Sequence, residues 1–430
     1  GVNATPGMPD SGIALAASLS SLNLDAWRGL LSGIGPDGSV PAEGGAGLPV
    51  TAYLVPDMVS LRAGELTFAE RTIENAAVGV SRIRNGWQFS ISSDEIAGRA
   101  AWEDPLSERG AGKLSARLTK LRIEPNMASD MTEILSGRRP AFTELPGLDI
   151  VVENFELRGM RLGRLELVAT NAGLSTGPGR EWRISRLALF NPGATMYATG
   201  QWITGLTGGQ TSLNYELEIA DAGMLLDRMG FARTLKGGKG KMEGELNWRG
   251  DPATFDFPSM AGKLSLKLGA GQFLKADPGV AKLLGVMSLQ SLPRRLTLDF
   301  RDVFSEGFGF DSIASTATIS RGVLTTDSFK MRGPQALVLM DGTVDLAQEM
   351  QNLNVVVIPD LNAGGASVLY GLAVNPVVGL GTFLAQYVLK NPLSAALTQE
   401  YQVTGPWKDP VIKKVASRRK LPAESETSTQ

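Results

Sequence analysis

The chain has 430 residues, with 42 Lys and Arg against 44 Asp and Glu, and it contains no cysteine and no histidine. Without these two residue types the chain alone cannot build a disulfide, a thiolate or histidine metal site, a Ser-His-Asp triad or a Cys-His dyad. The balanced charge gives no long-range attraction for nucleic acid, and the length suits two or three domains or one elongated repeat array.

The chain begins at Gly1 without the basic and apolar regions of a signal peptide, so we expect a piece or a processed form of a longer protein. Residues 11–31 predict a strand that leads at Asp25 into a short helix, and residues 33–49 predict a linker rich in Gly and Pro. Short strands follow over residues 50–102. Their turns are predicted at three dipeptides: Ala63-Gly64, Asn85-Gly86 and Asp94-Glu95.

A strand over residues 113–124 shows a slip in its pattern. Its apolar residues share one face as far as Leu118, and the series then resumes at Leu121, one residue out of phase. Such a slip predicts a β-bulge. The following residues 125–146 contain several prolines and little periodicity, so we expect a linker there.

Internal repeats indicate an array. The segment 148–202 follows the plan of 50–102, with REWRIS at 180–185 parallel to NGWQFS at 85–90. A tryptophan shortly before an Asp-Pro pair also ends three predicted strands, at Trp102, Trp248 and Trp407. Because Pro cannot donate to a strand ladder, each Asp-Pro pair is expected to end a repeat, which favours a stacked array over separate globules.

The clearest strands lie in the middle of the chain. Residues 213–219 and 264–268 alternate apolar with polar or charged side chains, so each strand has one apolar face and one solvated face. Between them, the segment from Asp221 to Met229 predicts a short helix that ends at Gly230.

The stretch 271–313 combines strands with a helix. Asp277 and Pro278 predict a helix start, and the apolar residues of 278–290 fall on one helical face. Residues 296–300 then alternate like a strand with one buried face. We therefore expect a short helix laid against a sheet.

The C-terminal strands have a different pattern. Leu337–Met340 and Val355–Ile358 are apolar throughout, as in strands buried on both faces. The uncharged run 361–389 is expected to cover them as two buried or interfacial helices, at about 366–373 and 376–389. A transmembrane helix is the less favoured alternative.

The sequence shows no complete motif for catalysis, metal binding or a cofactor. The Gly-rich run 237–241 lacks the Lys-Ser/Thr ending of a phosphate loop and precedes a strand, so a flexible turn is the better interpretation. Asp299, Asp302 and Asp311 are close in sequence, but alternation puts Asp299 on a solvated face, which argues against carboxylate catalysis or a calcium site. We therefore expect neither enzyme activity nor a cofactor.

The predicted apolar surface is larger than the predicted helices can cover. A short strand offers roughly 80 Å² per face and a fifteen-residue helix covers roughly 200 Å², so the helices shield at most about half of the sheet. The remaining surface either meets a second sheet in a β-sandwich or lines an open groove that holds acyl chains. Composition alone favours the sandwich.

Two segments carry a resemblance to a known family: FLKADPGVAKLLGVMSLQSLPRRLTLDFRDVFSEGF at 273–308 and YQVTGPWKDPVIKKV at 401–415. They resemble the C-terminal region of YhdP-type members of the AsmA-like proteins of Gram-negative bacteria. The likeness extends over most of the chain. It implies a β-groove in the periplasm that conducts phospholipid between the inner and outer membranes, with an anchoring N-terminal inner-membrane helix outside this chain. The resemblance reverses the preference from sandwich to groove.

We therefore expect a mainly β fold, an elongated array of antiparallel β-hairpins curled into a half-open hydrophobic groove with a few short capping helices. The expected divisions are a repeat at 1–124, a linker at 125–146, a repeat at 147–255, a groove with an amphipathic helix (278–290) at 256–360, apolar helices and a closing strand at 361–411, and a basic, then disordered tail at 412–430.

The expected site residues fall into three sets. Apolar strand residues expected to line the groove are Leu165, Leu167, Leu213, Tyr215, Leu217, Leu264, Leu266, Leu268, Leu296, Leu298 and Phe300. Helix residues expected to cap the groove or to dock it on a membrane are Val280, Leu283, Leu284, Met287, Val377, Leu380, Phe383 and Leu384. Basic residues expected to meet headgroups or a membrane are Arg294, Arg295, Lys413, Lys414, Arg418 and Arg419.

Two of these sets have a plainer interpretation. The lining residues could pack between two protein layers, and Arg294 and Arg295 could simply be solvated. The expected partners are phospholipids and the two membrane surfaces, not nucleic acid. The alternative function is a periplasmic structural or assembly factor that binds envelope proteins along its sheet edges. Bound lipid would separate the two functions, because a spacer should carry none.

Overall fold

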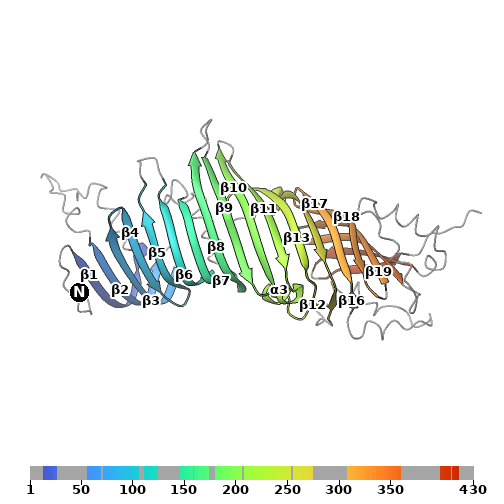
Figure 1. Cartoon of the computed structure of the whole chain (residues 1–430), viewed down its shortest axis with the longest axis horizontal. Helices are drawn as coiled ribbons and strands as arrows, with labels where there is room; N and C mark the ends of the chain where they lie inside the picture. The colour runs from blue at the N-terminus through green and yellow to red at the C-terminus, as the bar shows by residue number, and fades with distance from the viewer. Residues whose placement is uncertain are drawn as a thin grey trace, which may run out of the picture. The chain divides into compact units, whose positions relative to one another are not determined.

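A computed structural model describes residues 13–26, 56–68, 71–105, 111–123, 146–157, 159–173, 180–205, 208–252, 255–274, 308–334, 336–359, 398–407 and 409–415. In these ranges the chain is mainly β, with nineteen strands in an open sheet and three short strands in a second sheet (Figure 1). The expected mainly β fold is confirmed.

The chain divides into two compact units. Unit 1 comprises residues 1–191, 197–209 and 251–254, and unit 2 comprises 192–196, 210–250 and 255–430. The strands of unit 1 are β1 (Ala14–Asn23), β2 (Met58–Phe68), β3 (Arg71–Ile83), β4 (Gly86–Ser92), β5 (Ile96–Glu103), β6 (Lys113–Ile123), β7 (Gly147–Leu157), β8 (Met160–Gly173), β9 (Arg180–Asn191) and most of β10 (Ala194–Gly205).

From β1 to β9 the strands of unit 1 pair in chain order, as the blue to green ribbons of Figure 1 show. Most pairs are antiparallel, but β1 with β2 and β6 with β7 are parallel. Two neighbouring strands can be parallel only if the connection between them returns the chain to the end of the sheet at which the first strand begins. Residues 24–57 and 124–146 are these connections in the sequence. The two junctions therefore add parallel pairs to the antiparallel pairing that the sequence predicts.

The two parallel junctions place the repeated motif at equivalent positions. NGWQFS falls at the start of β4, the third strand counted from β2, and REWRIS falls in β9, the third strand counted from β7. The sequence echo therefore reflects the same position in two successive runs of strands.

Two local predictions in unit 1 had different outcomes. The bulge in β6 is confirmed, because Ala97 pairs with Lys120 and the next residue, Gly98, pairs with Leu118, which leaves Thr119 as the extra residue. The predicted turn at Ala63-Gly64 is wrong, because β2 continues through both residues. A Cβ on Gly64 would lie 2.8 Å from the backbone oxygen of Ser20, so this glycine permits close approach of β1.

Unit 2 has a second run of antiparallel strands. Its ladder is β11 (Gly208–Ile219), β13 (Gly240–Arg249), β14 (Ala261–Leu268), β17 (Ser312–Ser320), β18 (Val323–Arg332), β19 (Ala336–Asp345), β20 (Met350–Pro359), β21 (Gln399–Pro406) and β22 (Val411–Val415). A short 3-10 turn, η2 (Phe257–Ser259), precedes β14.

The predicted short helix is confirmed as α3 (Ala222–Arg228). Asp221 accepts a hydrogen bond from the Met224 backbone N–H at 2.9 Å, and Gly230 adopts a φ of 92° after the last turn. The small sheet of β12 (Leu235–Gly237), β15 (Gly271–Phe273) and β16 (Phe308–Phe310) packs with α3 in one hydrophobic cluster.

The prediction of strands buried on both faces is confirmed for β19 and β20. Val338 and Val355 belong to the main cluster of unit 2, whereas Leu337 and Ile358, on the opposite face, are at most 2% exposed. Because both faces of these strands are buried, their apolar runs are continuous and show no period-two alternation.

Several predictions lie outside the described residues: the helix at 278–290, the strand at 296–300, the uncharged run 361–389, the 125–145 part of the linker and the tail beyond 415. Where the structure does describe the chain, no helix is long and apolar enough to cross a bilayer.

Candidate functional site

The candidate site is the apolar face of the large sheet, which we define by its cross-strand rows. In unit 1 two rows cross nine strands without one polar residue. The first row is Ala17, Leu61, Val78, Ile91, Gly98, Leu118, Val152, Leu165 and Leu189, and the second is Leu15, Val59, Val80, Phe89, Ala100, Ala116, Ile150, Leu167 and Leu187.

Side chains on this face of unit 1 pack against described neighbours on the same face. Leu118, Val152 and Leu165 are 7%, 0% and 8% exposed, and the residues that pack with them come from β5 to β9 on the same face. Leu15, near the outer edge, is 47% exposed.

The opposite face of unit 1 is charged. Arg164 and Arg186 each lie 2.6 Å from a carboxylate oxygen of Glu166, and Arg117 lies 2.9 Å from Asp149. The arginine side chains of these pairs are 42–56% exposed, so the pairs contribute little to stability, but they keep this face in water.

Unit 2 continues the same alternation on its own strands. Leu217, Met242 and Leu266 form one cross-strand row, while Tyr215, Gly244, Leu264 and Ala317 form the next. Burial raises the pKa of the Tyr215 hydroxyl, which indicates an apolar setting.

One end of this face is covered by α3 and the small sheet. Leu225 of α3 and Phe273 and Phe310 of the small sheet pack in the same cluster as Leu266 and Leu268. Phe273 and Phe310 also contact each other with ring centroids 5.3 Å apart. Among the described residues, α3 and the small sheet therefore form the cover at this end. The predicted helix 278–290 lies outside the described residues.

The structure describes eight of the eleven predicted lining residues, and all eight belong to the apolar face: Leu165, Leu167, Leu213, Tyr215, Leu217, Leu264, Leu266 and Leu268. Lys413 and Lys414 lie exposed on β22. The other predicted residues fall outside the described part of the chain: Leu296, Leu298, Phe300, Val280, Leu283, Leu284, Met287, Val377, Leu380, Phe383, Leu384, Arg294, Arg295, Arg418 and Arg419.

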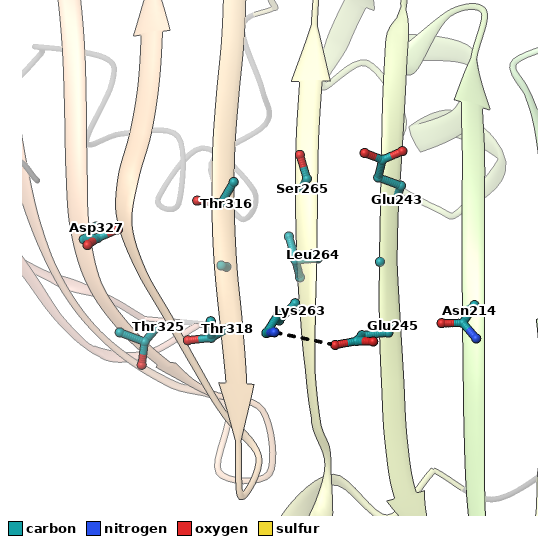
Figure 2. A pocket seen from close by; sticks show the side chains of 12 residues that line it. Asn214, Glu243, Glu245, Lys263, Leu264, Ser265, Thr316, Thr318, Thr325 and Asp327 are labelled. Atoms are coloured by element: carbon teal, nitrogen blue, oxygen red, sulfur yellow. Dashed lines mark ion pairs between the residues drawn. The ribbon is translucent and has the colours of Figure 1, made fainter. Parts of the chain in front are cut away.

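A hollow on the polar face of unit 2 was not predicted. It has a volume of about 610 Å³ and includes the cross-strand row Asn214, Glu245, Lys263, Thr318 and Thr325. Figure 2 shows these side chains on five neighbouring strands, with Lys263 and Glu245 paired at 3.9 Å. All five side chains are exposed, so the hollow is a shallow solvated depression.

Bulges in β17 and β18 lie beside this hollow. The pairing register shifts between Ala314 and Thr318, and Ser328 hydrogen-bonds to Thr316 where it shifts. Within the described ranges no group of three acidic, histidine or cysteine side chains could hold a metal ion. The arrangement offers a solvated surface for contact.

Comparison with known proteins decides the family. The family model described as "YhdP protein" matches residues 2–412. The chain belongs to the YhdP family. It is 27% identical over 427 residues to the "Intermembrane phospholipid transporter YhdP" of Escherichia coli (strain K12), an alignment that covers 95% of this chain and 31% of that protein. The chain thus spans about a third of the length of this curated YhdP relative. No solved structure matches it significantly.

Proposed function

We propose that the apolar face carries the acyl chains of phospholipids between the inner and outer membranes of a Gram-negative envelope. The observation that carries this proposal is the pair of rows that cross nine strands of unit 1 without a polar side chain. The name of the E. coli relative, an intermembrane phospholipid transporter, supports phospholipid as the cargo and transfer between two membranes.

Transfer energetics explain how such a face would work. Moving a methylene from an apolar setting into water costs about 0.8 kcal/mol, so exposing a sixteen-carbon chain costs about 12 kcal/mol. A continuous apolar face removes most of this barrier while the chain moves along it. Headgroups would stay in water at the rim of the face. The role is transport, and it requires no catalytic residue.

Site-specific photocrosslinking tests the proposal. A photoreactive residue at Leu264, on the apolar face, should form phospholipid adducts in cells that mass spectrometry detects. Lys263 is the matched control, because it is the preceding residue and lies exposed on the opposite face of β14. Equal adduct yields at the two positions, or no adducts at Leu264, would contradict the proposal.

A second candidate is an envelope assembly factor that binds partners along a sheet edge. The observation that favours it is β22, which pairs with β21 and has all five of its residues exposed. Val411 and Val415 are 49% and 43% exposed there. Lipid extracted from the purified chain separates the two functions, since an assembly factor should carry none.

A further inference from the structure

Gln351 is a polar side chain in an otherwise apolar row. It lies on β20 and alternates with Asn352, so it shares the face of Leu353 and Val355 in the main cluster of unit 2. The other members of its cross-strand row are apolar residues or glycines: Leu213, Leu246, Gly262, Ile319, Leu324, Val344 and Gly405.

The amide of Gln351 is buried and incompletely bonded. The residue is 8% exposed, and its Nε2 has no hydrogen-bond partner among the residues that the structure describes. A buried N–H group without an acceptor costs free energy that an apolar side chain of similar size would avoid. Its cross-strand neighbour Gly405 contributes no side chain, so that neighbour offers no acceptor beyond its backbone.

The same feature occurs independently in unit 1. The indole Nε1 of Trp202 is also buried and has no partner within the described ranges, and the ring packs with Trp182 and Ile184. In both units, therefore, a donor is left unpaired among apolar side chains. A ligand that suits both places must bring acceptors.

Ester carbonyl oxygens have this chemistry, because they accept hydrogen bonds and carry no charge. A phosphate would lose its hydration among apolar side chains, whereas an ester lies where the acyl chains of a lipid begin. We propose that Gln351 Nε2 donates a hydrogen bond to an ester carbonyl of a diacyl phospholipid whose chains lie on the apolar face. This assignment rests on the proposed transport function.

A comparison of ester and ether lipids tests the assignment. The purified chain is incubated with vesicles containing equal amounts of diester and diether phosphatidylethanolamine with matched chains, and the bound lipids are counted by mass spectrometry. The wild-type chain should favour the ester lipid about fivefold, the ratio expected for one neutral hydrogen bond. Gln351→Met should bring this ratio close to one and leave the melting temperature unchanged or higher.

A glutamine-to-methionine substitution at an exposed position serves as the control. Gln210→Met alters an exposed glutamine on β11 and should keep the wild-type ratio. Equal binding of both lipids by the wild-type chain, or a preference that persists in Gln351→Met, overturns the role of Gln351 and leaves the transport proposal standing. Absence of both lipids from the wild-type chain overturns the transport proposal and this assignment together.

Discussion

The ammonium nitrogen of Lys241 lies 2.9 Å from a carboxylate oxygen of Glu243, two residues further along β13. This hydrogen bond lowers the pKa of the Glu243 carboxyl below its ordinary value of 4.5. A carboxyl with a lowered pKa stabilises the fold above its unfolded-state pKa, and this contribution is lost as the pH falls through the lower folded-state value.

The first prediction follows from this pair. Lys241→Met should raise the pKa of Glu243 toward 4.5, because both the hydrogen bond and the positive charge are removed. An NMR titration of the side-chain carboxyl carbon measures it. Lys263→Met is the control and should leave the Glu243 pKa unchanged, since Lys263 pairs with Glu245. A Glu243 pKa that does not respond to Lys241→Met would show that the pair does not persist in solution.

The second prediction concerns the buried centre of unit 1. Leu165→Ala should lower the free energy of unfolding by about 2–4 kcal/mol, because the side chain is 8% exposed and its removal leaves a cavity beside Val152. Urea unfolding followed by circular dichroism measures the change. Glu153→Ala, which removes an exposed partner of Arg164, should cost less than about 1 kcal/mol. Similar losses in both variants would contradict this account.

The third prediction concerns the cap of α3. Asp221→Ala removes the side-chain acceptor of the Met224 N–H and should cost about 1 kcal/mol, with faster amide exchange in α3. Asp256→Ala is the matched control, because Asp256 precedes η2 without a side-chain capping bond. Equal effects at the two aspartates would rule out capping as the cause.

The fourth prediction concerns a glycine in the apolar row. Gly98 has a φ of 144°, and a Cβ on it would lie 2.4 Å from the backbone oxygen of Arg117. Gly98→Ala should therefore destabilise the chain by about 1–3 kcal/mol in urea unfolding. Gly309→Ala should be tolerated, because a Cβ there meets nothing within 4 Å. A stable Gly98→Ala chain would mean that β5 and β6 can separate at this point.

Period-two alternation predicted much of the apolar face. Leu213, Leu217 and Leu266 could be placed on it from sequence because one side of each strand is solvated. The phase slip after Leu118 likewise predicted the bulge, and Asp221 with Gly230 predicted both ends of α3. In each case the signal is local.

The features that sequence reasoning missed depend on distant parts of the chain. The parallel pairing of β1 with β2 depends on where a patternless connection returns, which no periodicity records. The hollow on the polar face adjoins bulges among Ser and Thr residues. Polar residues fall on both faces of the strands there, so the apolar residues do not reveal the change in alternation that a bulge causes. Gln351 could not be distinguished from a solvated residue before its row was known.

The two parallel junctions have a consequence for how such chains change length. The block from β2 to β6 has five strands, so its last strand points the same way as its first. At about 4.8 Å between strands, one block adds about 24 Å of sheet width. Gene duplication or loss of a whole block would therefore lengthen or shorten the sheet by a fixed step without inverting any neighbouring strand.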